Sequence, residues 1–510
     1  MAKKEKSETT AVIDIGSNEL RLAIAEDRQG RMKLLEHISY PLSLGRETFS
    51  NEKISFEYVE ITCASIKNFL DVMKEYDAAR YRAVATTAIR ESKNRDYILD
   101  QIKIKTGVTL DVLDDAEEKL YIYKLMASLV GPEYLNSALM VYSGSGNTGV
   151  SVWEGGVIPY MQNVRMGSLR LSELFVDIQD YTGQFHTVVM EYIKSLTDFL
   201  DFPEKIQYLI ASGQEAQVIA SLTGAKRDKL FSTIDAGKLD NLFEDIKNKT
   251  EERIAEDYSL PREKAEVLLP AVLTYMDLLS RTEAAEIITP PVLLSDALMY
   301  EMLYPQRFAE INREFDKSTL ISAEAIAAKF MMHAEHYKAV ERQAVQIFDR
   351  LKKIHGMGKR EKLLLQTAAI LHDTGKVINI NSHYRHSYDI VKGSSVIGLN
   401  SAETEIVALL CLYHSRPTPE TEPEQYMKIG ISDRVLVSKL TAILRLAEAL
   451  DSSHRQKIGE AEPVVNEKEF VLIITTNENI DLEIWSFEEK AAMFQDVFGL
   501  KASIRQRRMV

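Results

Sequence analysis

Histidine and aspartate residues that could hold a metal ion gather in one part of the chain. Seven of the ten histidines lie between Lys317 and Ser453. Imidazole and carboxylate ligands together suit a divalent transition metal or Mg²⁺, with positions left open for water and phosphate. Any one of these histidines alone would more often be a core or surface residue, so the prediction rests on the whole set. The candidate ligands are His336, His372, Asp373, His386, His414 and Asp451.

The pair His372-Asp373 ends an apolar helical run, KLLLQTAAILHD, that Gly375 stops. Lys376 follows one short turn later, where its ammonium group could neutralise phosphate charge. His383 lies in the same segment as His386, SHYRHSYDIV, between the pair and His414.

A second group of candidate residues lies in two similar glycine turns. AVIDIGSNELRLAIAE (11–26) and LMVYSGSGNTGVSVWE (139–154) each contain an apolar strand, a Gly/Ser turn with Asn, and a second apolar strand. Two such turns that face each other across a cleft would offer backbone N–H groups and hydroxyls to one phosphate chain. The alternative interpretation is two ordinary hairpins with polar tips.

Several motifs follow one another in a fixed order. They are DIGSNELR (14–21), ATTAIRESKNRD (85–96), Glu117-Glu118, the turn at 143–149, Met166–Leu171, Ala211–Gly213 and Ser295–Leu298. In this order they resemble the exopolyphosphatase / guanosine pentaphosphate phosphohydrolase family. The resemblance covers nearly the whole chain and implies a pair of actin-like (ribonuclease H-like) domains with a phosphoanhydride cleft between them.

The same resemblance implies roles for individual residues. Phosphoanhydride hydrolysis needs groups that hold the phosphoryl group, a cation that neutralises its charge, and a carboxylate that orients water. Glu118 aligns with the family's candidate base, Glu117 and Asp14 complete the catalytic set, and Mg²⁺ or Mn²⁺ is the implied cofactor. For Glu118 the alternative is a solvated face at the start of a helix. The implied phosphate-binding residues are Gly16, Ser17, Asn18, Arg90, Asn94, Gly144, Gly146, Asn147, Thr148 and Gly213.

The second turn departs from the family pattern, Asp-Ile-Gly-Gly-Gly-Ser-Thr-Glu. Tyr142 stands where the first acid is expected, and Gly149 stands where the second is expected. Because Mg²⁺ prefers carboxylate ligands, we expect weak Mg²⁺ binding in this cleft. The glycines and Thr148 remain, so we still expect this cleft to bind a phosphate chain.

The histidine-rich segment carries a second resemblance. Its order is His336, the His372-Asp373 pair and a distal Asp451, with two additional histidines between. This order is similar to that of the HD phosphohydrolase superfamily and implies a metal-holding helical domain, with a transition metal as one candidate cofactor. The alternative is a relic fold that keeps these residues for packing.

The predicted fold class is α/β, with two actin-like domains, an all-α HD domain and a small α+β C-terminal cap. Strand-like runs such as RLAIAED alternate with helical runs such as EYVEITCASIKNFLDVMKEY in the first part. In the cap we expect strands at EFVLIITT, NIDLEIWS and LKASIRQR and a helix at EEKAAMFQDVFG. The expected ranges are a disordered tail over 1–10, domain I over 11–130, domain II over 131–305, the HD-like domain over 317–453 and the cap over 456–510.

The amino-acid composition argues against some classes of binding partner. The 62 Lys plus Arg against 76 Asp plus Glu give a net charge of −14, which argues against nucleic acid and membrane surfaces as partners. Cys63 and Cys411 lie far apart and show no metal-binding spacing. With no signal-like or membrane-spanning apolar run, we expect a soluble, cytoplasmic protein, and family analogy suggests a homodimer.

Different interpretations of function remain open. In the first, which we adopt as the predicted function, the protein releases terminal phosphate from inorganic polyphosphate or guanosine pentaphosphate in the cleft, with Glu118 as base. In the second, the cleft senses polyphosphate or a nucleotide, and hydrolysis belongs to the metal-dependent HD domain. In a third, neither site is active and the chain is a regulatory scaffold.

Overall fold

A computed structural model describes residues 9–508 of the protein apart from residues 177–184, 201, 204, 460 and 467. The chain forms two compact units, Met1–Phe315 and Asp316–Val510. Most of the predicted tail over 1–10 lies outside the described residues, but Thr9 and Thr10 belong to the first strand. None of the described helices combines the length and apolar character needed to cross a membrane.

The first unit contains two mixed sheets. The first sheet consists of β1 (Thr9–Ile15), β2 (Glu19–Arg28), β3 (Arg31–Pro41), β4 (Arg80–Ala85) and β5 (Asp111–Val112). The second consists of β6 (Ser137–Ser143), β7 (Thr148–Glu154), β8 (Val157–Val164), β9 (Tyr208–Ser212), β10 (Lys226–Arg227), β11 (Ser232–Asp235) and β12 (Glu286–Thr289).

The two sheets repeat one strand pattern. Their orders are β3-β2-β1-β4-β5 and β10-β11-β12-β9-β6-β7-β8. In each sheet three antiparallel strands come first, and the next strand pairs in parallel with the first of them, β4 with β1 and β9 with β6. The echo between residues 11–26 and 139–154 is therefore a structural repeat, and each copy contains a tight turn.

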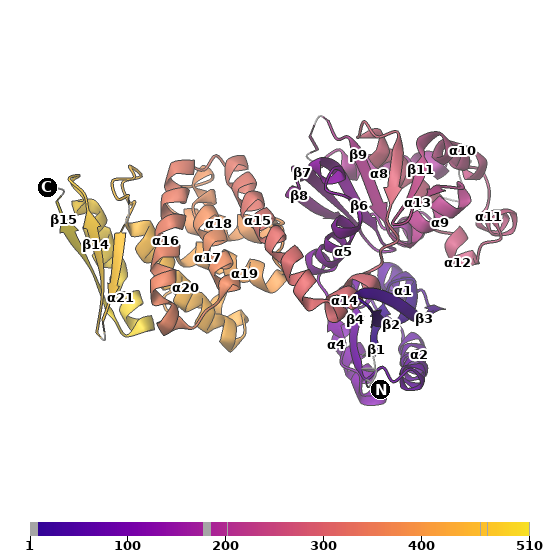
Figure 1. Ribbon diagram of the computed structural model, residues 1–510, viewed down its shortest axis with the longest axis horizontal. Helices are drawn as coiled ribbons and strands as arrows, with labels where there is room; N and C mark the ends of the chain where they lie inside the picture. Colours follow the sequence, from indigo (N-terminus) through magenta and orange to yellow (C-terminus); the bar gives the residue numbers. More distant parts are fainter. Residues whose placement is uncertain are drawn as a thin grey trace. The chain divides into compact units, whose positions relative to one another are not determined.

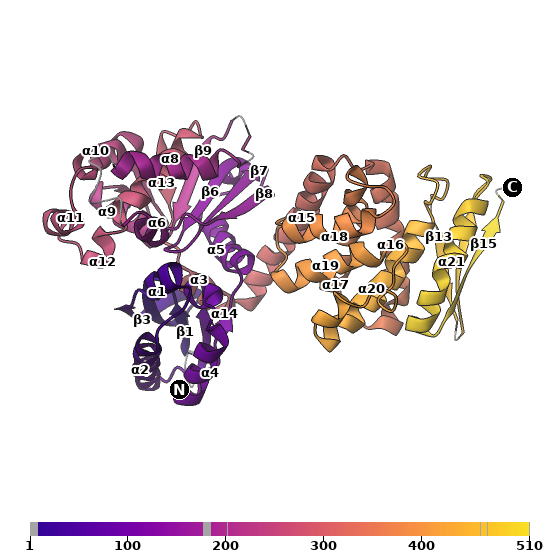
Figure 2. The ribbon, with the colours of Figure 1, turned by 180° about the vertical axis from the view of Figure 1, so that it is seen from behind.

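Helices pack on these sheets (Figure 1), and α2 and α4 contact each other beside the first sheet (Figure 2). All of β1 from Thr10 onward is buried, as expected for a strand covered on both faces. The helices are α1 (Leu44–Asn51), α2 (Phe56–Glu75), α3 (Thr87–Glu91), α4 (Arg95–Thr106), α5 (Asp115–Leu129), η1 (Tyr134–Asn136), α6 (Ser168–Leu174), α8 (Phe185–Thr197), α9 (Gln214–Leu222), α10 (Ala236–Ile246), α11 (Glu251–Tyr258), α12 (Arg262–Ala265), α13 (Leu268–Ser280) and α14 (Leu294–Leu303).

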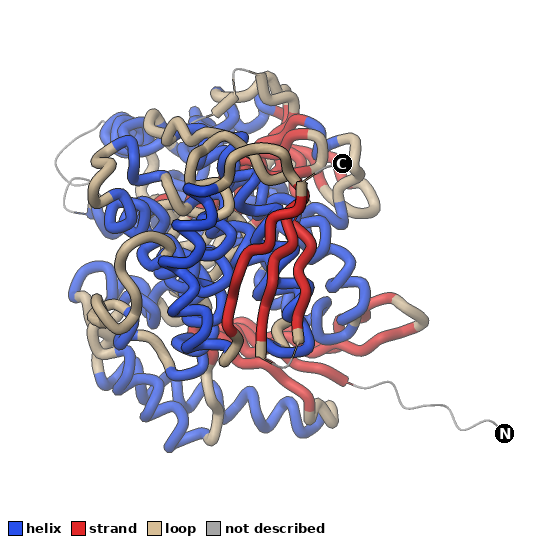
Figure 3. The backbone as a smooth tube through the Cα atoms, turned by 90° about the vertical axis from the view of Figure 1, so that its left-hand side faces the viewer, coloured by secondary structure: helices blue, strands red, loops and turns tan. Residues whose placement is uncertain are grey.

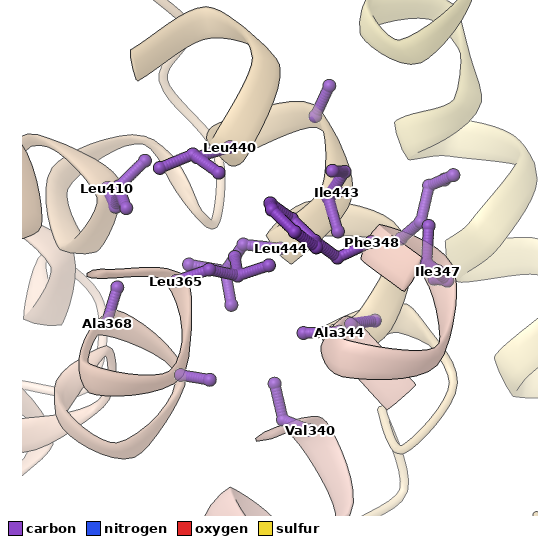
Figure 4. Close-up of a cluster of buried hydrophobic side chains, with 14 of the residues drawn as sticks. Val340, Ala344, Ile347, Phe348, Leu365, Ala368, Leu410, Leu440, Ile443 and Leu444 are labelled. Carbon is purple, nitrogen blue, oxygen red and sulfur yellow. The ribbon is translucent and has the colours of Figure 1, made fainter. Parts of the chain in front are cut away.

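The second unit is a helical bundle followed by a small sheet. One continuous helix, α15 (Pro305–Lys329), runs from the first unit into the second. The bundle contains α16 (Ala334–His355), α17 (Lys359–Leu371), η2 (Thr374–Val377), α18 (His383–Gly393), α19 (Ser401–Tyr413), η3 (Tyr426–Lys428) and α20 (Ile431–Ala449). Side chains of α16, α17, α19 and α20 meet in its core, around Phe348 and Leu444 (Figure 4).

The sheet of the second unit has the order β13-β14-β15. Figure 3 shows its strands side by side. Its elements are β13 (Ala461–Val465), β14 (Glu469–Thr475), α21 (Asp481–Phe498) and β15 (Lys501–Arg507).

The prediction of a strand over NIDLEIWS is wrong, because α21 already begins at Asp481. The apolar residues of this segment alternate, which is typical of a strand. In the structure, however, Ile480, Glu483 and Phe487 are buried, a spacing of three and four that places them on one helical face. Leu482 and Trp485 point to the exposed side of the helix.

The packing of the bundle core predicts how far a cavity there would lower the free energy of unfolding. Phe348 is 2% exposed in the core of the second unit. We expect Phe348→Ala to lower the free energy of unfolding by about 3–5 kcal/mol, as buried Phe→Ala changes do. Urea unfolding followed by circular dichroism measures this, with Ile380→Ala as control because Ile380 is 73% exposed. Equal stabilities of the two variants would contradict this account of the core.

Candidate phosphate cleft and candidate metal centre

The two hairpin turns of the first unit have the same backbone geometry and line one pocket, the cleft. The N–H of Gly16 donates to the carbonyl of Glu19 at 3.0 Å, and the N–H of Gly144 donates to that of Asn147 at 3.0 Å. The cleft brings together these predicted residues: Asp14, Gly16, Ser17, Asn18, Glu118, Gly144, Gly146 and Asn147.

Helix α5 supplies the acidic wall of the cleft. The Asp114 carboxylate caps this helix by accepting the N–H of Glu117 at 2.8 Å, which sets the rotation of its first turn. Glu118 lines the cleft, whereas Glu117 is not among the lining residues, and the Glu117 carboxylate lies 4.0 Å from the guanidinium of Arg82. The catalytic role of Glu117 stays a prediction.

Three predicted phosphate-binding residues are not among those that line the cleft. The side-chain Oδ1 of Asn94 accepts from the N–H of Ile54 at 3.1 Å, and its side-chain Nδ2 donates to the Ile54 carbonyl at 2.8 Å. The buried Thr148 hydroxyl donates to the Met166 carbonyl at 3.2 Å. Gly213 has a φ of +122°, and a Cβ there would lie 2.3 Å from the Ser143 carbonyl oxygen. Thr148 and Gly213 therefore lie at the second turn, and Asn94 joins the segments before α2 and α4.

Arg90 also lies outside the lining, behind Glu118. Its guanidinium donates to the Leu113 carbonyl at 2.6 Å and to the Thr87 hydroxyl at 2.9 Å. It also pairs with Asp115 and, at 3.4 Å, with Glu118. In the structure Arg90 contacts a carboxylate that lines the cleft, and its predicted role as a phosphate ligand stays a prediction.

Sequence reasoning missed Lys119, the residue directly after Glu118. Lys119 lines the cleft, and its Nζ lies 2.8 Å from Glu118 Oε1 and 4.8 Å from the centre of the Tyr142 ring. Burial alone would raise the pKa of Glu118, but Lys119 and Arg90 hold it below its usual range. The sequence did contain an indication that Lys119 belongs to the site. Lys119 directly follows the candidate base Glu118, in a cleft where two expected acids are absent.

The carboxylates of the cleft are a poor fit for a divalent ion, although one oxygen is unpaired. Asp14 Oδ2 pairs with Arg21 at 3.5 Å, and its buried Oδ1 has no hydrogen-bond partner in the described part of the chain. Burial raises the pKa of Asp14 to about 6. Glu118 pairs with Lys119 and Arg90. Among the described residues, the groups of three ligand atoms close enough for a metal lie in the second unit and not here. The weak Mg²⁺ binding expected for this cleft stays a prediction.

The second unit brings a set of imidazoles around the Asp373 carboxylate. The Nε2 atoms of His336, His372, His383 and His414 lie 3.5, 3.5, 3.4 and 3.6 Å from its oxygens. His336 is in the first turn of α16, and His383 begins α18. The other two follow the last residues of α17 and α19, so the ends of several helices converge. We call these residues, with Asp451 and His454, the histidine cluster.

Hydrogen bonds at the other ring nitrogen fix the tautomers. The Nδ1 atoms of His372, His383 and His414 each lie 2.7–2.8 Å from a backbone carbonyl three residues earlier. The Nδ1 of His336 lies 2.8 Å from Asp451 Oδ2. Since these partners are acceptors, each Nδ1 carries the proton, and each Nε2 keeps a lone pair 3.4–3.6 Å from the Asp373 carboxylate.

The electrostatics of the cluster favour the ligand forms of these side chains. Burial lowers the pKa of His414 to about 4 and that of His372 well below its usual range. Burial would raise the pKa of Asp373, but His372 and His414 hold it well below its usual value. Neutral imidazoles and a carboxylate are the forms that bind metal ions. The buried Nε2 atoms of His336 and His372 have no hydrogen-bond partner in the described part of the chain, so the donor set fits a divalent ion.

Two histidines differ from the prediction. Among the described residues, the contact from α18 comes from His383, whose Nε2 lies 3.2 Å from His414 Nε2, and not from His386. The two residues are one turn apart, so spacing alone could not decide between them. His454 was missed, and its ring stacks on that of His336 with centroids 3.6 Å apart. It lies just beyond Asp451, where the helical pattern had ended.

The repeated sheets, with glycine turns that line one cleft, are typical of an actin-like fold. Residues 23–305 match the Ppx/GppA phosphatase family, and residues 320–490 match domain III of the Ppx/GppA phosphatases. The chain therefore belongs to the Ppx/GppA phosphatase family, whose members are phosphatases.

Relatives and solved structures agree with this assignment. The chain is 23% identical over 468 residues to a guanosine-5'-triphosphate,3'-diphosphate pyrophosphatase of Photobacterium profundum, covering 89% of this chain and 88% of that protein. One from Vibrio atlanticus is 24% identical, with 88% and 87% covered. The crystal structure of the Ppx/GppA family member of Aquifex aeolicus has a TM-score of 0.50 at 20% identity, covering 59% of this chain and 99% of that chain. An exopolyphosphatase from Cytophaga hutchinsonii has a TM-score of 0.50 at 18% identity, with 58% and 98% covered. These structures support the fold.

The geometry of the histidine cluster predicts which histidine of α18 holds a metal. We expect His383→Ala to weaken Mn²⁺ binding at least about tenfold, because one Nε2 ligand is removed. His386→Ala is the matched control and should bind within about twofold of the wild type. Equilibrium dialysis against Mn²⁺ with metal analysis of the protein measures both. A larger loss in His386→Ala than in His383→Ala would return the ligand role to His386.

Proposed function

We propose that the protein is a phosphoanhydride hydrolase that releases terminal phosphate from inorganic polyphosphate or guanosine pentaphosphate. Its family and the names of its relatives support the reaction class. The two glycine turns that line one cleft support a chain of phosphates as the ligand. The family resemblance also leads us to propose a cytoplasmic protein and a homodimer.

We place the hydrolytic step at the histidine cluster, which we interpret as an HD-type site. The observation that carries this assignment is the convergence of lone-pair Nε2 atoms on the Asp373 carboxylate. Two of these buried atoms have no hydrogen-bond partner in the described part of the chain. Lone-pair acceptors this close to a carboxylate repel it, and a divalent ion among them would offset this repulsion in addition to the Lys376 contact.

Residues of the cluster have separate roles in this proposal. His336, His372, Asp373, His383 and His414 would hold a divalent ion, which supplies Lewis-acid chemistry to a bound phosphoryl group. Asp451 keeps the His336 ring in its tautomer. The Lys376 ammonium contacts Asp373 and lies 3.4 Å from His454 Nε2, so it can neutralise charge on a phosphate oxygen.

Hydrolysis in the cleft, with Glu118 as the base, is the second candidate function. It is favoured by the position of Glu118 in the cleft lining and by its lowered pKa, which keeps it ionised. Its bonds to Lys119 and Arg90 weigh against this candidate, because both cations reduce its tendency to accept a proton. In our proposal the cleft therefore binds the polyanion, and turnover occurs elsewhere in the chain.

Phosphate release from a substrate panel separates the two candidates. The panel contains inorganic polyphosphate and guanosine pentaphosphate, each with Mg²⁺ and with Mn²⁺. We expect Asp373→Ala to lower the rate at least about 100-fold and Glu118→Gln to retain it within about threefold. His386→Ala is the control for a change beside the cluster and should leave the rate within about twofold. Activity that survives Asp373→Ala but is lost in Glu118→Gln would assign turnover to the cleft.

A further inference from the structure

Lys119 is a charged side chain held inside the wall of the cleft. Its side chain is 1% exposed, and its Nζ bonds to Glu118 Oε1 at 2.8 Å. The same ammonium group lies over the face of the buried Tyr142 ring, 4.8 Å from its centre. A lysine is almost never buried without a compensating partner, so this position is a specific feature of the cleft.

The space that Lys119 fills depends on the residue at position 149. A Cβ on Gly149 would lie 2.9 Å from both Cγ and Cδ of Lys119 and 2.6 Å from the Tyr123 hydroxyl. Contacts this short require atoms to move, so the Lys119 stem fits here because residue 149 has no side chain. Tyr142 supplies a ring face on the other side. The two positions that lack the expected acids are thus the two that accommodate Lys119.

We propose that Lys119 is a phosphate-binding residue that supplies the cation of the cleft, so that the cleft binds a polyphosphate chain without a divalent ion. A phosphate chain needs positive charge beside the backbone donors of the two glycine turns. Among the described residues, the groups of three metal-ligand atoms lie outside the cleft, whereas Lys119 belongs to its lining and bonds to Glu118, which also lines it.

The chemistry of an ammonium group suits this role. It carries three N–H donors, and Glu118 accepts one of them. Lys119 can therefore donate to a phosphate oxygen and keep its bond to Glu118, while Arg90 balances the carboxylate from behind at 3.4 Å. A fixed lysine needs no capture of an ion from solution, so binding should persist in a chelator.

Calorimetric titration of the full chain with inorganic tripolyphosphate in EDTA tests this inference. We perform it on the Asp373→Ala variant, so that binding at the histidine cluster does not contribute. We expect binding in EDTA and a loss of at least about tenfold in affinity in Lys119→Met, since one charge-assisted hydrogen bond is removed. Lys119→Arg keeps the charge and should remain within about threefold.

Lys124→Met is the matched control. Lys124 is also buried on α5, but its ammonium group lies over the rings of Phe308 and Phe315 and it does not line the cleft. The affinity of Lys124→Met for tripolyphosphate should stay within about twofold of that of the Asp373→Ala parent. Equal losses in Lys119→Met and Lys124→Met would overturn the inference, as would binding that appears only when Mg²⁺ exceeds the chelator. If a thermal melt shows that Lys119→Met does not fold, two other results test the inference. These are the dependence of tripolyphosphate binding on Mg²⁺ and the affinity of Lys119→Arg. Neither result depends on whether the histidine cluster hydrolyses phosphate.

Discussion

A buried carboxylate needs a compensating positive charge, and the two sites of the chain meet this requirement in different surroundings. In the cleft, Lys119 and Arg90 both contact Glu118. At the histidine cluster, the Lys376 ammonium contacts Asp373, and four imidazole Nε2 atoms lie 3.4–3.6 Å from the same carboxylate. The Nδ1 atoms of His372 and His414 face backbone carbonyls, so their Nε2 atoms can act as ligands. The imidazole ligands, and not an unbalanced charge, are therefore what suits the second site to an added cation.

Much of the fold could be predicted from the sequence because it repeats. The echo of residues 11–26 at 139–154 reflects two hairpins with the same turn hydrogen bond and the same strand order. The prediction failed where one pattern fits two structures. NIDLEIWS alternates like a strand, yet burial of Ile480 and Phe487 places it on a helix. Helical propensity and tertiary packing decided there, and neither is visible in the alternation.

The sequence predicted the group of residues that forms each candidate site, but not the position of every residue in the group. Asp373 of the His372-Asp373 pair and the distal Asp451 both contact His336, at its two ring nitrogens. The choice between His383 and His386 depends on the rotation of α18, which the sequence does not determine. Asn94 has the residue type of a phosphate ligand, but both ends of its amide bond to Ile54. Residue type alone therefore cannot separate a ligand of the cleft from a support of its loops.

The residues that stand in place of the expected acids in the second turn make room for Lys119. Loss of a carboxylate at position 142 or 149 alone would leave a polar cleft with less negative charge. Here a tyrosine ring and a bare backbone at these positions surround one lysine. A side chain at position 149 would have competed with Lys119 for this space, and Lys119 already forms an ion pair with Glu118. The residues at positions 142 and 149 therefore act on Lys119 through packing, which supports our proposal that the chain itself supplies the cation of the cleft.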